Sequence, residues 1–185
     1  MKRIYLLIIA IITFNSVSFS QEMTKEVMMF GVGIGPSNDY LGVTGFSSPA
    51  LRFTIEKGMF EIGPGVLALG GEVGAYYQTY KSYYYNSNYT SFIFAGRAAY
   101  YYNFGELLQT PQFNAYAGCA FGLRIISDNH KTNYPGLYYY TDQGGVFPHF
   151  GSFLGANYFL TKNIAGFVEA GYDMSWGTIG FDFTF

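Results

Sequence analysis

The sequence has little charge and almost no cysteine. Its 185 residues include 10 basic and 12 acidic side chains, which make up 12% of the chain, whereas an ordinary soluble domain has about 25%. The single cysteine, Cys119, excludes an internal disulfide framework and a multi-cysteine metal site. The formal net charge of -2 offers no basic field for nucleic acid. Beyond residue 20 no apolar run approaches the roughly 18 residues of a spanning helix.

Aromatic residues and glycine are abundant instead. The chain contains 19 Tyr, 19 Phe and 24 Gly, and aromatic residues make up 21% of it. This content of large apolar side chains argues against disorder. A surface with so little charge would be hard to keep in solution. The composition therefore indicates a β-protein of a membrane.

The N-terminal residues have the three-part pattern of a secretory signal peptide. Lys2 and Arg3 precede an apolar stretch at 4–14, and a short polar stretch with small residues follows. The apolar stretch is shorter than the roughly 20 residues that a membrane-spanning helix needs. We predict that 1–20 is a cleaved signal peptide and that 21–185 is one exported domain.

Apolar and polar residues alternate along most of the chain beyond the leader. Such alternation predicts strands with one apolar face, and strands of roughly ten residues suit a tilted, membrane-spanning barrel. The predicted segments are 27–36, 49–57, 66–80, 91–104, 113–127, 146–160, 164–174 and 177–185. The predicted fold is an all-β, eight-stranded antiparallel up-and-down transmembrane β-barrel.

The charges within these segments fall on the face opposite the bulky apolar residues. In 49–57, for example, Leu51, Phe53 and Ile55 alternate with Arg52 and Glu56. A soluble barrel would turn the charged face outward, but this face is sparse and rich in glycine, which suits a narrow lumen. We predict that the charges pair inside the barrel, because buried charges need partners. The predicted network comprises Arg52, Glu56, Glu72, Arg97, Arg124, Glu169, Asp173 and Asp182.

The links between the segments alternate in length. Longer, polar links are predicted at 37–48, 81–90 and 128–145, and mostly shorter ones at 58–65, 105–112 and 161–163. The longer links would be extracellular. Tyrosines gather in or beside them, either as an outer aromatic girdle or as a recognition surface. These are Tyr83, Tyr84, Tyr85, Tyr138, Tyr139 and Tyr140.

At this point the chain resembles the small eight-stranded outer-membrane β-barrel family of Gram-negative bacteria. The segments at 62–65 and 70–74 look like members from the Bacteroidetes lineage. The resemblance implies location in the outer membrane, contact with its lipid and lipopolysaccharide, and insertion by the barrel-assembly machinery. The residues of the last segment that look like the family's assembly signal are Ile179, Phe181, Phe183 and Phe185.

Two rival functions remain open from the sequence. Some barrels that resemble this one modify lipid A with a histidine, a serine and an acid, and such a nucleophile must hydrogen-bond its base. His149 is followed by Ser152, whose odd separation puts the two on opposite faces of a strand. The other rival is a narrow channel or transporter for a small or hydrophobic solute, although eight strands leave room only for side chains.

We therefore expect a non-catalytic integral outer-membrane protein without a cofactor or a bound metal. Its expected role is surface interaction, adhesion or envelope integrity through the long links, with an extracellular ligand or a host surface as partner. We expect no nucleic-acid partner and favour a monomer.

Overall fold

The structure is a computed structural model that describes residues 23–37, 45–81, 85–104, 112–132 and 144–185. All regular elements in these ranges are strands. They are β1 (Met28–Pro36), β2 (Gly45–Ser47), β3 (Pro49–Ile62), β4 (Gly65–Lys81), β5 (Tyr85–Asn103), β6 (Phe113–Thr132), β7 (Gly145–Phe159), β8 (Ile164–Tyr172) and β9 (Gly177–Thr184). The predicted signal peptide, 1–20, lies outside the described residues. The described residues contain no helix that is long and apolar enough to cross a membrane.

The strands form one closed antiparallel sheet. Their order is β2-β4-β3-β1-β9-β8-β7-β6-β5, and β4 also pairs with β5, which closes the sheet into a barrel. The short β2 continues the line of β3 along β4, and Ser48 separates the two. The barrel therefore has eight staves, with β2 and β3 sharing one, and the predicted eight-stranded antiparallel β-barrel is confirmed.

Most bulky apolar side chains of the strands point outward, whereas the charged side chains, many small ones and a few apolar ones point inward. On β3, Leu51, Phe53 and Ile55 are 51%, 43% and 50% exposed, whereas Arg52 and Glu56 are each 2% exposed. The same alternation follows from the period-two geometry of every strand. This polarity is the reverse of a soluble ligand-carrying barrel, which would be apolar inside. The apolar face is therefore turned outward, as predicted.

The hairpin between β3 and β4 is tighter than the sequence predicted. The predicted link at 58–65 is largely strand, because β3 continues to Ile62 and pairs there with Gly65. A register shift between Gly58 and Phe60 interrupts the alternation, as a β-bulge does. Gly63 has a φ of 58°, a left-handed conformation that glycine adopts without steric cost.

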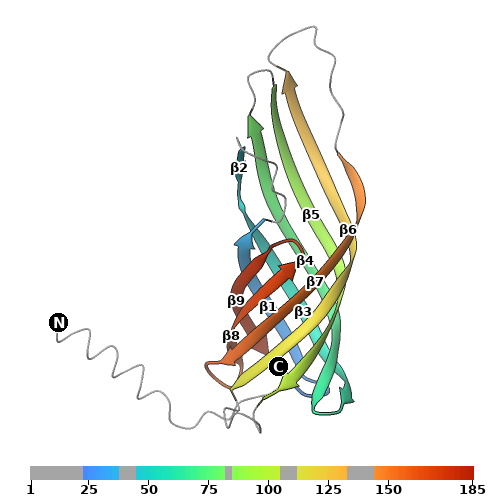
Figure 1. Cartoon of the computed structure of the whole chain (residues 1–185), viewed down its shortest axis with the longest axis vertical. Helices are drawn as coiled ribbons and strands as arrows, with labels where there is room; N and C mark the ends of the chain where they lie inside the picture. Colours follow the sequence, from blue (N-terminus) through green and yellow to red (C-terminus); the bar gives the residue numbers. More distant parts are fainter. Residues whose placement is uncertain (1–22, 38–44, 82–84, 105–111, 133–143) are drawn as a thin grey trace, which may run out of the picture.

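At one end of the barrel, which we call the tall end, β4, β5 and β6 project beyond the other strands (Figure 1). The predicted links at 81–90 and 128–145 are partly strand there, because β4 and β5 pair as far as Lys81 and Asn86, and β5 and β6 as far as Thr132. These segments are rich in Tyr, Ser, Thr and Asn and lack a clear apolar face, so their strand character left no alternation in the sequence. The backbone pairing of the ladders shows the extension.

The tyrosines predicted as a loop surface divide accordingly. Tyr85 is the first residue of β5, where its backbone pairs with Thr132, and it therefore belongs to a strand. The other five, Tyr83, Tyr84, Tyr138, Tyr139 and Tyr140, lie outside the described residues, as do 38–44 and 105–111 from the other predicted links.

The opposite end, which we call the short end, contains the Gly63 turn and the start of β1. Residues just before β1 pack beneath the barrel there, and Met23 is only 1% exposed. The amide of Glu26 donates a hydrogen bond to the carbonyl of Gly58 at 2.9 Å. The Glu26 carboxylate lies 2.5 Å from Nζ of Lys57, and this hydrogen-bonded ammonium lowers the pKa of Glu26. The segment before β1 therefore lies at the short end of the lumen.

Candidate functional site

The interior of the barrel contains a layer of charged side chains. They project from β3, β4, β5 and β9, and from β8 and the residue that follows it. Each of them is at most 6% exposed. They are Arg52, Glu56, Glu72, Arg97, Glu169, Asp173 and Asp182. We call this set the lumen layer; all seven belong to the network predicted from the sequence.

Arg97 is the centre of the lumen layer. Its Nε donates to Glu56 and its Nη2 to Glu169, and its Nη1 lies 3.0 Å from Oε2 of Glu72. Its guanidinium carbon also lies 3.5 Å from the centre of the Phe153 ring. Arginine suits this position because its planar group has five donors and stacks on aromatic faces. One side chain thus joins β3, β4, β5 and β8 across the lumen.

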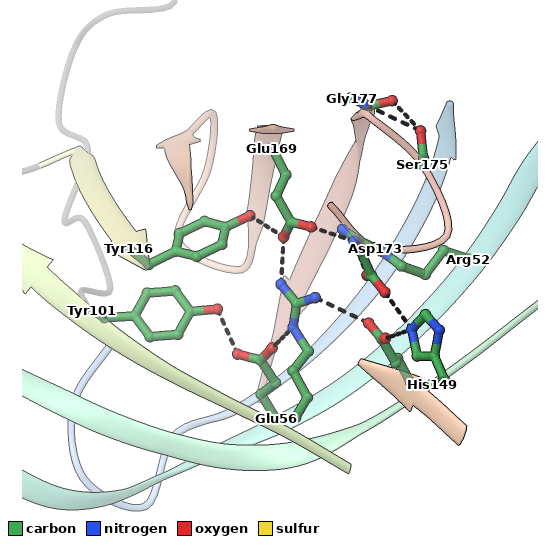
Figure 2. Close-up of polar contacts among 11 residues, drawn as sticks. Arg52, Glu56, Tyr101, Tyr116, His149, Glu169, Asp173, Ser175 and Gly177 are labelled. Carbon is green, nitrogen blue, oxygen red and sulfur yellow. Dashed lines mark hydrogen bonds and ion pairs between the residues drawn. The ribbon is translucent and has the colours of Figure 1, made fainter. Parts of the chain in front are cut away.

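Arg52 forms the second centre. It donates to Oε1 of Glu169 and lies 3.5 Å from Oδ2 of Asp173, as the close-up shows (Figure 2). Its guanidinium carbon is 5.6 Å from the centre of the Phe167 ring. Glu169 therefore bridges both arginines, one with each carboxylate oxygen.

Two tyrosines and a histidine complete these contacts, although the sequence analysis did not assign them to the network. The hydroxyl of Tyr101 donates to Glu56 at 2.6 Å, and that of Tyr116 donates to Glu169 at 3.0 Å (Figure 2). Nε2 of His149 lies 2.7 Å from Oδ1 of Asp173. The alternation that identified the inward charges could also have identified these residues, because all three lie at inward positions of their strands.

Arg124 and Asp182 differ from the predicted pairing. Arg124 lies four positions further along β6 than Ala120, the register partner of Arg97. Its Nη2 is 3.5 Å from Oγ of Ser91, and its guanidinium carbon is 5.4 Å from the Tyr76 ring centre. It therefore occupies a different level of the lumen, because each residue of a strand rises about 3.3 Å. Asp182 is inward and buried, but within the described ranges no ion pair joins it to an arginine.

Apolar side chains enclose the lumen layer on both sides. Towards the tall end stands a small cluster of Ala50, Tyr76, Ile93 and Met174. Towards the short end stands a larger cluster of Met23, Val27, Met29, Ala68, Ala99, Tyr101, Tyr116, Ala120 and Phe153. The described side chains thus fill the middle of the barrel, as expected for eight strands.

The four residues of the predicted assembly signal share the outward face of β9 and its end. Ile179, Phe181 and Phe185 are 61%, 52% and 77% exposed, and Phe183 is partly buried. The Phe185 backbone also exchanges two hydrogen bonds with Met28, of 2.9 and 3.2 Å. The backbone of Phe185 therefore contributes to closure between β9 and β1, and its ring lies outside.

Among the residues that the structure describes, Ser152 is not brought to His149. The His149 side chain is buried in the lumen, whereas Ser152 lies on the outward face of β7 and pairs in register with Cys119 and Tyr172. The other histidine, His130, pairs in register with Ser87 on β5, towards the tall end. The partners that the structure gives to His149 are carboxylates.

These observations define a closed eight-stranded antiparallel β-barrel with an ion-paired interior and an apolar exterior. No protein-family model and no curated protein match the chain. Among solved structures, it is similar to the N-terminal β-barrel domain of Pseudomonas aeruginosa OprF, with 14% identity and a TM-score of 0.39. That match covers 87% of this chain and 98% of the other. None of these comparisons supports the narrower Bacteroidetes lineage.

Proposed function

We propose that this protein is a non-catalytic barrel of the bacterial outer membrane that acts through its tall end. The observation that carries the proposal is the reversed polarity of the barrel, with paired charges inside and large apolar side chains outside. In water such an exterior would be a large exposed apolar patch. In a bilayer the apolar side chains face lipid, and closure leaves no unpaired sheet edge within it.

The lumen layer supports a structural role rather than transport. Arg97 and Arg52 contact four carboxylates across the lumen, and apolar clusters stand on both sides of them. A solute would have to break several buried ion pairs to pass. This leaves β4, β5 and β6, which project beyond the other strands (Figure 1), as the part of the barrel that we propose to act at the surface.

The location is tested by fractionation and by gel migration. We expect the protein in the outer-membrane fraction, and we expect faster migration on SDS gels in unboiled than in boiled samples. Absence from that fraction, together with no heat-dependent shift, would contradict the membrane barrel. Conductance in planar bilayers separates the channel alternative: we expect no steady current from the wild-type protein, and a reproducible unitary current would favour the channel.

The role is tested in a deletion strain complemented with the full chain or with a chain shortened at 133–143. As a matched control, the turn at 161–163 at the short end is replaced instead. A surface role predicts that adhesion returns with the full chain and the control but not with the shortened chain. An envelope role predicts that resistance to detergents and large antibiotics returns with all three. A strain with neither defect contradicts both roles.

The enzyme alternative is tested in the same strains. We expect the mass spectrum of lipid A to be unchanged between the deletion strain and the strain complemented with the full chain. A change of acyl pattern that depends on His149 would contradict the non-catalytic proposal.

A further inference from the structure

Three side chains with metal-ligand chemistry meet inside the barrel. Glu72 on β4, His149 on β7 and Asp173 after β8 each offer one ligand atom, and these atoms all lie within 4.8 Å of one another. All three residues are buried. His149 and Asp173 come from the neighbouring β7 and β8, whereas Glu72 comes from β4, which pairs with neither of these strands. The sequence predicted no metal site, and these three residues lie far apart along the chain.

One oxygen in this group is available to a ligand. Oε2 of Glu72 accepts a hydrogen bond from Arg97 at 3.0 Å, but Oε1 has no hydrogen-bond partner among the described residues. It lies 4.0 Å from Nε2 of His149, and the residue is 2% exposed. A buried carboxylate oxygen without a partner is costly, because it has lost water without replacing it.

The charge of the lumen layer also favours a bound cation. Five buried carboxylates share this layer with only two buried arginines, Arg52 and Arg97, and with a histidine that is neutral unless protonated. The layer therefore has three more acidic than basic side chains. Buried charges in proteins are paired or coordinate metals. A divalent cation would remove most of this excess.

We propose that Glu72, His149 and Asp173 bind one divalent metal ion of the Zn²⁺ class. The ligands would be Nε2 of His149 and one carboxylate oxygen from each of the two acids, with water in the remaining position. Imidazole nitrogen combined with carboxylate oxygen is a donor set for Zn²⁺ rather than for Mg²⁺ or Ca²⁺. The ion would link β4 to β7 and to the end of β8, across the barrel.

The geometry requires only small movements. Donors at about 2.0–2.2 Å from a tetrahedral ion stand about 3.4 Å apart. Oε1 of Glu72 would approach Nε2 of His149 from 4.0 Å, while Oδ1 of Asp173 would move away from its present 2.7 Å. Bonds from the ion to Nε2 and Oδ1 would replace the direct contact between His149 and Asp173.

The test uses the full-length protein, purified in detergent and stripped with EDTA, and Co²⁺ and Zn²⁺ alone as probes. We expect one equivalent of Co²⁺ to give the visible absorption of a four-coordinate nitrogen and oxygen site, and one equivalent of Zn²⁺ to displace it. We also expect Zn²⁺ to raise, and EDTA to lower, the temperature at which the band on SDS gels shifts to the unfolded position.

Variants assign the site. Glu72→Gln and His149→Asn should each lose the Co²⁺ absorption and the response to Zn²⁺ while still showing the heat-dependent shift of a folded barrel. Asp182→Asn removes another buried carboxylate of the layer, and His130→Asn removes the chain's other histidine; both should keep the signal.

Three outcomes would overturn the proposal. The first is no stoichiometric Co²⁺ signal in the wild-type protein, with equal stability in Zn²⁺ and EDTA. The second is a signal that persists in both ligand variants. The third is a signal abolished by His130→Asn. Because two different ligands are replaced separately, a failure of one variant to fold still leaves the other to decide.

Discussion

Arg97 and Glu169 meet inside the barrel although 72 residues separate them in the sequence. Nη2 of Arg97, on β5, donates to Oε2 of Glu169, on β8. Two other strands, β6 and β7, stand between β5 and β8 in the sheet. This contact therefore spans the lumen rather than following the wall, and it connects strands whose backbones do not pair with one another.

Removal of Arg97 should strongly destabilise the barrel. Arg97→Ala leaves Glu56, Glu72 and Glu169 with less positive charge in a buried layer, and breaking a buried ion pair costs about 3–5 kcal/mol. We expect a loss of that size in the free energy of unfolding, measured by urea titration of the refolded protein in detergent. Arg97→Lys should recover part of it, because it restores the charge but not the fork of donors.

The matched control for Arg97 is Lys57→Ala, which removes a cation from an exposed pair with Glu26. Exposed pairs contribute little, so its unfolding curve should nearly coincide with that of the wild type. Equal losses of unfolding free energy in Arg97→Ala and Lys57→Ala would contradict a stabilising role of the lumen layer.

Gly70 lies where the backbones of β3 and β4 approach each other too closely for a side chain. It pairs in register with Glu56 on one side and Arg97 on the other, and a Cβ at this position would collide with the carbonyl oxygen of Ile55. Gly70→Ala should therefore lower the free energy of unfolding by about 1–3 kcal/mol, the usual cost of overpacking. The midpoint of urea unfolding measures the change.

Gly166 on β8 is the control for this substitution, because no heavy atom lies within 4 Å of a Cβ placed there. Gly166→Ala should be neutral or stabilising, by up to about 1 kcal/mol. If both alanines had the same effect, the glycine at 70 would not be a steric requirement.

The outward face should reject charge when the barrel is in a bilayer. Phe94 on β5 is 50% exposed and pairs in register with Val73 and Leu123, which are also outward and exposed. Phe94→Arg should cost about 2–4 kcal/mol in phospholipid vesicles if this row lies near the bilayer midplane. Phe94→Leu, which keeps the face apolar, should cost much less. Equal unfolding curves for the two variants in vesicles would contradict a lipid-facing position.

The predicted assembly signal should affect delivery more than stability. Phe185 contacts Met28 through backbone hydrogen bonds, which Phe185→Ala retains, and its ring is 77% exposed. We expect a several-fold lower amount of Phe185→Ala in the outer membrane of cells, at an almost unchanged temperature of the gel shift. Tyr172→Ala, which removes another exposed ring, is the control and should be delivered normally. Normal delivery of Phe185→Ala as well would remove this residue from the signal.

The register of strands with two different faces was predictable from the sequence. In β3, the apolar and charged residues at 51–56 occur in strict alternation, and the structure gives them alternating exposure. The extensions of β4, β5 and β6 at the tall end were not predictable, because both faces of a projecting strand are polar and leave no period-two signal. The end of β3 was also not predictable. The bulge near Met59 inserts an extra residue, so the residues after it have the opposite alternation of inward and outward side chains.

The sequence by itself determined the all-β class, the number of staves and the face on which each lumen charge lies, because side-chain direction in a strand depends only on the position along it. Only the tertiary structure decided which charges meet. Partners such as Arg97 and Glu169, or Glu72 and His149, lie on strands that do not pair with each other. Their distance depends on closure, strand tilt and stagger, and these are properties of the whole sheet rather than of any segment. For the same reason Arg124 has the right face but occupies another level of the lumen.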